Sequence, residues 1–170
     1  PHRPFEVVSW NIDKLSPADA PTVLDTISGT FSWDAICFQE AQGWDRVSEQ
    51  DLCMHGLYTN PSCKAAILLH SSLVQGVSLY EHNDIAVALG VGDSLLISAY
   101  PPDSSHDLDD YDAALDALQT LLNLSLSQRP FHQVTVCMDG QVQLPPLALP
   151  GLVGDFTTGT WASFDLRASL

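Results

Sequence analysis

The chain has 170 residues, of which 45% are hydrophobic, so we expect one domain with a buried core rather than a disordered chain. Its 21 Asp and Glu residues outnumber its 6 Lys and Arg residues, which gives a formal net charge of −15. This charge opposes binding to a phosphate backbone, so a nucleic-acid partner is not favoured. The longest apolar runs are much shorter than the roughly 18 residues of a membrane span, so no span is expected.

The first third of the chain predicts two strands with a helix between them. Residues 6–13 are expected to form the first strand. Ser16, followed by Pro, has the pattern of a helix N-cap, and the apolar stripe behind it ends at Gly29. Residues 33–40 are the second expected strand, and residues 43–61 are polar and irregular.

Four short apolar segments separated by Ser, Gly, Asn and Asp come next, a pattern typical of an antiparallel meander. The predicted strands are residues 65–70, 77–81, 85–90 and 94–99. Tyr100 follows the last of them directly. Pro101 and Pro102 then end the ladder because proline cannot donate a backbone hydrogen bond.

The strongest helix signal lies between Leu108 and Leu122, where Leu and Tyr recur at helical spacing. Several Asp residues crowd its first turn, where the helix dipole favours negative charge, and a metal site there is the less favoured interpretation. Residues 133–138 predict a buried strand, and only residues 161–166 predict a further one. Strands joined by crossing helices indicate an α/β or α+β fold.

Three predicted strands end in an acid or amide side chain. These are Asn11, Glu40 and Asp139. Oxygen ligands of this kind suit Mg²⁺, which serves phosphoryl transfer by polarising a phosphate oxygen and helping to generate hydroxide. The alternative is that the three side chains only cap their strands. Trp10 and Phe38, which lie beside them in the sequence, are expected in the core.

The cysteines show neither a zinc pattern nor a redox motif, because none of them forms a CxxC pair. Cys37 and Cys137 lie in apolar strands and are expected as core thiols. Cys53 and Cys63 flank a loop and are compatible with a disulfide, although two free thiols are favoured.

Five segments, in this order along almost the whole chain, resemble the endonuclease/exonuclease/phosphatase superfamily, in particular the endonuclease domains of non-LTR retrotransposons. The segments are SWNID, DAICFQE, CKAAILLH, LLISAYPPDSS and VTVCMDGQVQLPP. The resemblance implies a single domain over residues 1–170, built as a two-sheet β-sandwich flanked by helices.

The resemblance also implies a role for each polar strand end. Asn11 would hold the phosphate or the nucleophilic water, and Glu40 would be the principal Mg²⁺ ligand. Tyr100 would contact the scissile phosphate, and Asp139 would orient or deprotonate the nucleophile. Gln141 stands where the superfamily has Asn, which keeps the amide but lengthens the side chain by one methylene.

Two departures from the superfamily pattern bear on activity. The motif Gly-Asp-aromatic-Asn is replaced by Met-Asp-Gly-Gln at residues 138–141. The Asp-His pair that the superfamily places near its C-terminus has no counterpart before Leu170. We therefore expect the second sheet to be incomplete and another protein to cover its uncovered edge.

Three functions are compatible with these observations. We favour a catalytically degenerate domain that acts as a structural or protein-interaction module in a larger assembly. The first alternative is a Mg²⁺-dependent endonuclease of retrotransposon type. The second alternative is a phosphatase or phosphodiesterase with a small substrate, which tolerates an acidic surface better than DNA binding does. Mg²⁺ is the expected cofactor only if the site is active.

Overall fold

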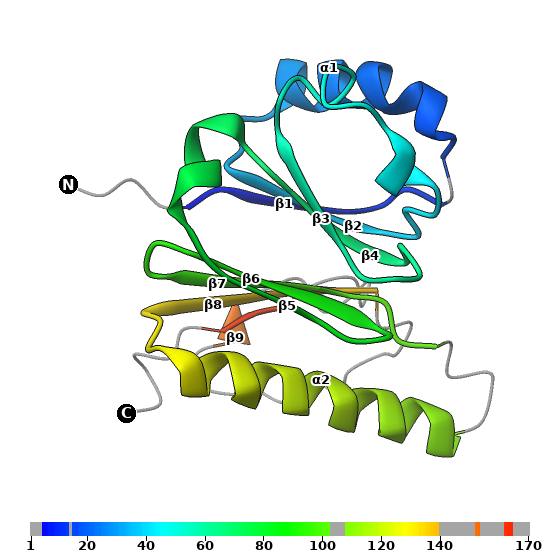
Figure 1. The fold of residues 1–170 in the computed structure, drawn as a ribbon. Coiled ribbons are helices and arrows are strands. Elements are labelled where there is room, and N and C mark those ends of the chain that lie inside the picture. The colour runs from blue at the N-terminus through cyan, green and yellow to red at the C-terminus, as the bar shows by residue number, and fades with distance from the viewer. Residues whose placement is uncertain (1–4, 14, 103–107, 140–151, 154–161, 165–170) are drawn as a thin grey trace.

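The computed structural model describes residues 5–13, 15–102, 108–139, 152–153 and 162–164. Two β-sheets pack face to face, helix α1 covers the outer face of one sheet, and helix α2 covers the outer face of the other (Figure 1). The expected two-sheet sandwich flanked by helices is therefore confirmed.

The first sheet, called sheet A, has four strands in the order β1-β2-β4-β3. Their bounds are β1 Val7–Asn11, β2 Ala35–Gln39, β3 Gly56–Thr59 and β4 Ala65–Leu69. Strands β1 and β2 are parallel, so the chain must cross between them. The crossing consists of a 3₁₀ turn, Pro17–Asp19, and helix α1, Ala20–Thr30. Ser16 caps the turn as predicted, and accepts a hydrogen bond from the Ala18 amide.

The second sheet, called sheet B, has six strands in the order β5-β6-β7-β8-β10-β9. Their bounds are β5 Val77–His82, β6 Ala86–Val91, β7 Ser94–Ala99, β8 Gln133–Met138, β9 Leu152–Val153 and β10 Ala162–Phe164. Helix α2, Leu108–Gln128, crosses between the parallel strands β7 and β8. Strand β10 lies within the segment expected to form a strand, whereas β9 was not predicted.

The predicted four-stranded meander is wrong in its first strand. Strand β4 pairs with β2 and β3 in sheet A, and a 3₁₀ turn, Ser71–Gly76, leads the chain to β5 in sheet B. The sequence pattern of β4 marks a strand but does not specify its partner. Strand β3 was missed because it is a four-residue edge strand between polar loops.

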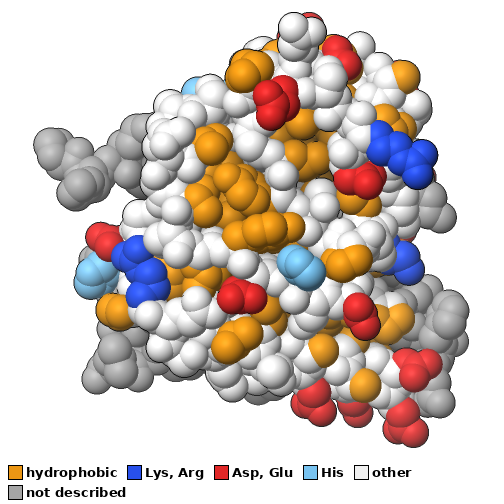
Figure 2. Space-filling model, in the orientation of Figure 1, with side chains coloured by type: hydrophobic (Ala, Val, Ile, Leu, Met, Phe, Trp, Pro, Cys, Tyr) orange, Lys and Arg blue, Asp and Glu red, His pale blue; other side chains and the backbone are white. Residues whose placement is uncertain are grey.

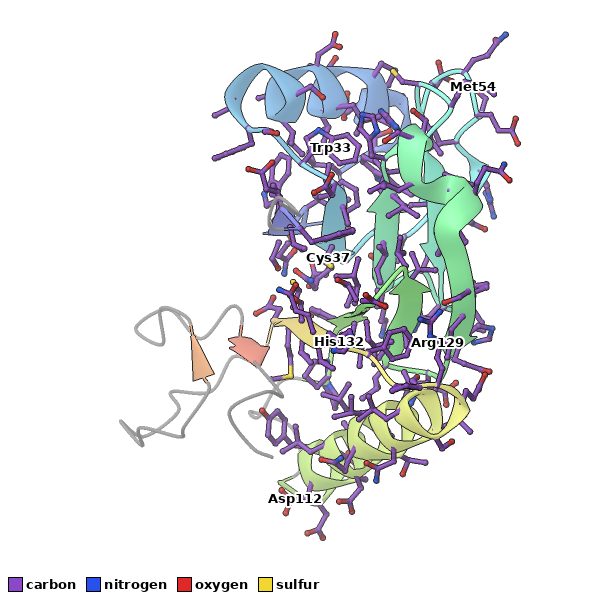
Figure 3. The ribbon with its side chains drawn as sticks, turned by 90° about the vertical axis from the view of Figure 1, so that its left-hand side faces the viewer. Trp33, Cys37, Met54, Asp112, Arg129 and His132 are labelled. Carbon is purple, nitrogen blue, oxygen red and sulfur yellow. The ribbon has the colours of Figure 1, made fainter. Side chains whose placement is uncertain are left out.

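Alternation along each strand divides the core into three layers. In β2, Ile36 and Phe38 pack beneath α1, whereas Ala35 and Cys37 face sheet B. In β7, Leu96 belongs to the layer between the sheets, and its neighbours on the chain pack toward α2. The layer between the sheets therefore consists of alternate residues of both sheets, and Cys37 is labelled in it in Figure 3.

Phe38 is fully buried as expected, but the expectation that Trp10 is a core residue is wrong. Trp10 is 36% exposed because β1, like β3, is an edge strand of sheet A among the described residues. The four cysteines are free thiols: Cys37 and Cys137 are buried as predicted, and Cys53 and Cys63 form no disulfide. No helix in the described part of the chain is long and apolar enough to cross a membrane.

Gly90 in β6 is required by the close approach of Phe131. A Cβ atom at Gly90 would lie 2.7 Å from Phe131 Cζ and 3.0 Å from Leu79 Cβ. We expect Gly90→Ala to lower the free energy of unfolding by about 1–3 kcal/mol, as measured by urea denaturation. Gly29→Ala is the matched control, because a Cβ there meets nothing within 4 Å and the residue lies in a helix. Equal losses in the two variants would contradict this packing.

Two histidines meet Trp33 at the end of sheet A where β2 begins, beside a cavity of about 280 Å³ (Figure 3 labels Trp33). The His55 and His70 ring centroids are 4.8 Å apart. His55 Nδ1 accepts a hydrogen bond of 2.9 Å from the Ser71 amide, and His70 Nδ1 accepts one of 3.3 Å from the Ser72 amide. Both bonds require an unprotonated Nδ1.

Burial lowers the pKa of His55 from its usual value of 6.5, and the neighbouring His70 lowers it further. Between the folded pKa and about pH 6.5, the unfolded chain therefore binds more protons at His55 than the folded chain does. The contribution of His55 to stability falls as the pH decreases across this interval and is constant below it. Urea denaturation between pH 5 and 8 should show this loss, and His55→Gln should reduce it. His132→Gln is the control, because His132 is exposed. A His55→Gln protein with the same pH dependence of stability as the wild-type protein would contradict the prediction.

Candidate active site

The C-terminal ends of four strands meet at one edge of the layer between the sheets. Strands β1 and β2 are parallel neighbours in sheet A, with Asn11 opposite Gln39. Strands β7 and β8 are parallel neighbours in sheet B, with Ala99 opposite Met138. Parallel neighbours end on the same side of a sheet, so the polar residues at their ends are brought together.

Asn11 and Asp139 join the two sheets at this edge. The Asn11 Nδ2 amide donates a hydrogen bond to Asp139 Oδ2, across 128 residues of sequence. Asn11 Oδ1 accepts a 2.8 Å hydrogen bond from the backbone amide of Asp13. Both ends of the Asn11 amide are therefore bonded, so its orientation is set, and it orients the Asp139 carboxylate in turn.

Glu40 and Tyr100 form a second contact between the sheets, in which the Tyr100 hydroxyl donates a hydrogen bond to Glu40 Oε1. Glu40 has a φ of 56°, in the left-handed region that costs a non-glycine residue about 1–2 kcal/mol. An unbroken strand would direct residue 40 toward α1, as it directs Phe38. The left-handed conformation instead turns Glu40 toward Tyr100.

Backbone hydrogen bonds hold the two residues of this second contact. The Glu40 amide donates to the carbonyl of Lys64 at 2.7 Å, which fixes the left-handed turn beside β4. The Tyr100 amide donates to the carbonyl of Ile85 at 2.8 Å, which keeps Tyr100 aligned with β6 although its strand has ended. The side chains of Glu40 and Tyr100 are half-buried, so a molecule at this edge can reach both.

The structure thus brings together four of the five predicted site residues, Asn11, Glu40, Tyr100 and Asp139. The two pairs are neighbours, because Asn11 lies opposite Gln39, next to Glu40, and the Asp139 amide donates to the carbonyl of Ala99, next to Tyr100. Gln141, the fifth, lies outside the described residues. Sequence reasoning missed two buried polar residues directly beneath the site, Gln39 and Ser98. The sequence signal that could have found them is alternation along the strand. Gln39 continues the row of Ala35 and Cys37 that faces the other sheet, where a polar residue is unexpected.

The oxygen atoms at this edge suit a magnesium ion. Mg²⁺ is commonly held by one or two carboxylates and keeps several waters, and Glu40 supplies a carboxylate beside the Asn11–Asp139 pair. No group of three or more His, Cys, Asp and Glu side chains in the described ranges is arranged to hold a metal ion. Glu40 and Asp139 are the carboxylates at this edge that could hold such an ion.

Neither a protein-family profile nor a curated protein matches this sequence. Solved structures do match. The 3' phosphatase NExo from Neisseria, solved with a product DNA hairpin, has a TM-score of 0.63 and 12% identity and matches over 84% of this chain and 60% of its own. TDP2 from Caenorhabditis elegans has a TM-score of 0.64 and 16% identity and matches over 88% of this chain and 51% of its own.

Both proteins are members of the endonuclease/exonuclease/phosphatase superfamily, and the chain shares their fold. The chain spans 60% of the length of the Neisseria protein and 51% of the length of the worm protein. Because the sequence identities are this low, the similarity shows a shared fold and nothing more.

Proposed function

We propose that this chain is a Mg²⁺-dependent phosphoester hydrolase domain of the endonuclease/exonuclease/phosphatase type. The assembly of Asn11, Glu40, Tyr100 and Asp139 at one edge supports this proposal. If these residues were only independent strand caps, nothing would require them to hydrogen-bond across the two sheets. Instead, Asp139 of sheet B accepts a hydrogen bond from Asn11 of sheet A, and Glu40 of sheet A accepts one from Tyr100 of sheet B.

Each residue has a role that its position allows. Glu40 would hold the metal ion, and Tyr100, which donates a hydrogen bond to Glu40, would contact the phosphate. Asp139 accepts a proton from the attacking water or orients that water, and Asn11 fixes the carboxylate of Asp139 for this task. A bound Mg²⁺ would polarise the phosphate and lower the pKa of a coordinated water. Gln141, which lies outside the described residues, would by the resemblance supply the amide that the superfamily motif provides with Asn.

Charge favours a small or terminal phosphate ester over a long duplex. The formal net charge of −15 repels a polyanion, and acidic side chains gather over α2 on the face drawn in Figure 2. A protein that neutralises many phosphates needs a basic surface, whereas a single phosphate group needs only the site itself. The likeness of sequence segments to retrotransposon endonucleases supports internal DNA cleavage as the competing substrate class.

Three substrates distinguish these possibilities. Supercoiled plasmid reports internal nicking, a 3'-phosphorylated oligonucleotide reports removal of a terminal phosphate, and p-nitrophenyl phosphate reports hydrolysis of a small ester. We expect hydrolysis of the two phosphomonoesters in Mg²⁺ or Mn²⁺, loss of hydrolysis in EDTA, and little nicking. Metal-independent hydrolysis, or no hydrolysis of any of the three, would contradict the proposal.

A second candidate function, a catalytically degenerate protein-interaction module, is favoured by the uncovered edge of sheet A. Strand β1 has neighbours on one side only in the described part of the chain, and its Trp10 is 36% exposed. Val7 and Val8 of the same strand are only half-buried. Unpaired strand edges with apolar side chains are pairing sites, so this module would bind another protein along β1.

If the chain is an interaction module, a substitution on β1 should disrupt its complex with the partner. Trp10→Asp should abolish a complex with the partner, detected by co-purification from the native source, and leave the monomer folded. The complex should survive Glu40→Gln, because the β1 surface does not depend on the polar strand ends. A complex lost in Glu40→Gln but retained in Trp10→Asp would contradict docking at β1.

A further inference from the structure

A buried polar contact links the two sheets directly beneath the site. Gln39 in β2 is 1% exposed and Ser98 in β7 is 0% exposed. Gln39 Nε2 donates a hydrogen bond of 3.2 Å to Ser98 Oγ. The same Ser98 hydroxyl donates a hydrogen bond of 2.9 Å to the backbone carbonyl of Phe38. One hydroxyl of sheet B therefore holds both the side chain and the backbone at the end of β2.

Because of its apolar surroundings, this polar contact restricts how the two sheets can slide over each other. The layer around it consists of apolar side chains and thiols, such as Cys37, Leu96 and Cys137. Contacts of that kind depend weakly on direction, so they allow small sliding movements of one sheet over the other. Hydrogen bonds weaken steeply with misalignment, and unpaired buried polar groups are costly. The Gln39–Ser98–Phe38 bridge therefore opposes sliding at this end of the sandwich.

The bridge is next to the Glu40–Tyr100 contact along both strands. Gln39 immediately precedes Glu40 in the chain, so the bridge holds the residue just before the left-handed turn at Glu40. Ser98 lies two residues before Tyr100, and residues at this spacing point to the same face of a strand. Any displacement of Gln39 relative to Ser98 would therefore change the separation of Glu40 and Tyr100.

We propose that Gln39 and Ser98 are positioning residues that set the geometry of Glu40 and Tyr100 without touching the substrate. The inference rests on the proposed function for its catalytic consequence, but its geometric claim is independent of catalysis. Active-site groups need support that holds them to a fraction of an ångström, and a misplacement of about 1 Å can cost about 100-fold in rate.

The variants separate this role from general core packing. Ser98→Ala removes the hydroxyl, and Gln39→Leu removes the amide at similar size. Ser98→Thr keeps a hydroxyl and is the rescue variant. Ser125→Ala is the matched control, because Ser125 is also 0% exposed and bonds to the Leu121 carbonyl at 2.8 Å, but lies in α2. All four are first compared by circular dichroism and urea denaturation.

The geometric readout is ¹⁹F NMR of protein labelled with 3-fluorotyrosine at its 4 tyrosines. Tyr100→Phe assigns the Tyr100 signal, and Glu40→Gln shows how that signal moves when its bond to the carboxylate changes. We expect Ser98→Ala and Gln39→Leu to move or broaden the Tyr100 signal, and Ser98→Thr and Ser125→Ala to leave it unchanged. A Tyr100 signal that is unmoved in Ser98→Ala and Gln39→Leu would overturn the proposal.

The kinetic readout applies to whichever phosphate ester the wild-type protein hydrolyses. We expect Ser98→Ala to lower kcat by between about 10-fold and about 100-fold with little change in KM, and Ser98→Thr to restore it. An equal loss in Ser125→Ala would overturn the positioning role and indicate a general effect on stability. If the wild-type protein hydrolyses nothing, the proposed function fails, and the Tyr100 signal alone decides whether the bridge sets the geometry.

Discussion

Replacing Glu40 with Gln is expected to lower Mg²⁺-dependent phosphoester hydrolysis by at least about 100-fold while leaving the fold intact. The substitution removes the negative charge that would hold the metal but keeps the size of the side chain and an oxygen that can accept the Tyr100 hydrogen bond. Initial rates with saturating Mg²⁺ measure the effect. The folded state should survive, because Glu40 is half-buried at the edge of the sandwich rather than in its core.

Glu49→Gln is the matched control for this experiment. Glu49 is exposed on the loop between β2 and β3, so the variant makes the same change in net charge without altering the site. Its rate should equal that of the wild-type protein. A Glu40→Gln protein that is folded and retains full metal-dependent activity would show that Glu40 does not hold the metal.

The largest expected effect on stability is that of Trp44→Ala, with a loss of about 3–5 kcal/mol in the free energy of unfolding. Trp44 is 0% exposed, and its ring centroid lies 5.1 Å from that of Phe38. Its indole Nε1 donates a hydrogen bond of 3.0 Å to the Leu15 carbonyl, which ties the loop after β2 to the segment after β1. Truncation would remove this bond and leave a cavity beneath α1.

Trp10→Ala is the control for the Trp44 experiment, since it deletes the same side chain at an exposed position of β1. We expect Trp10→Ala to cost less than half as much as Trp44→Ala in urea denaturation. Similar losses in the two variants would contradict the assignment of Trp44 to the core between α1 and sheet A.

The strands that carry the site were predictable because each shows an apolar pattern that ends in a polar residue. Val7 to Asn11 and Val134 to Asp139 have this form, and both polar ends lie where strand ends are expected to meet. The first crossing helix was visible from its N-cap and apolar stripe, and the second from its helical periodicity and acidic first turn. A crossing helix allows its flanking strands to be parallel, and parallel neighbours bring their polar ends to one edge.

Features that depend on partners far apart in the sequence were not predictable. Strand β4 has the same apolar pattern whether it pairs with β2 or with β5, and only its pairing places it in sheet A. The left-handed conformation of Glu40 has no sequence signal, because residues with positive φ are more often Gly, Asn or Asp. The Gln39–Ser98 contact joins residues 59 positions apart, so alternation could mark Gln39 as inward-facing without naming its partner.

The most direct test of the proposed site is a titration of ¹⁵N-labelled protein with Mn²⁺, because the paramagnetic ion broadens the amide signals of residues near it. Substoichiometric Mn²⁺ should broaden the signals around Glu40 and Asp139, excess Mg²⁺ should reverse the broadening, and Glu40→Gln should prevent it. Broadening confined to the acidic start of α2, at Asp109, Asp110 and Asp112, would contradict a metal site at the strand ends. The absence of any site-specific broadening would also contradict it.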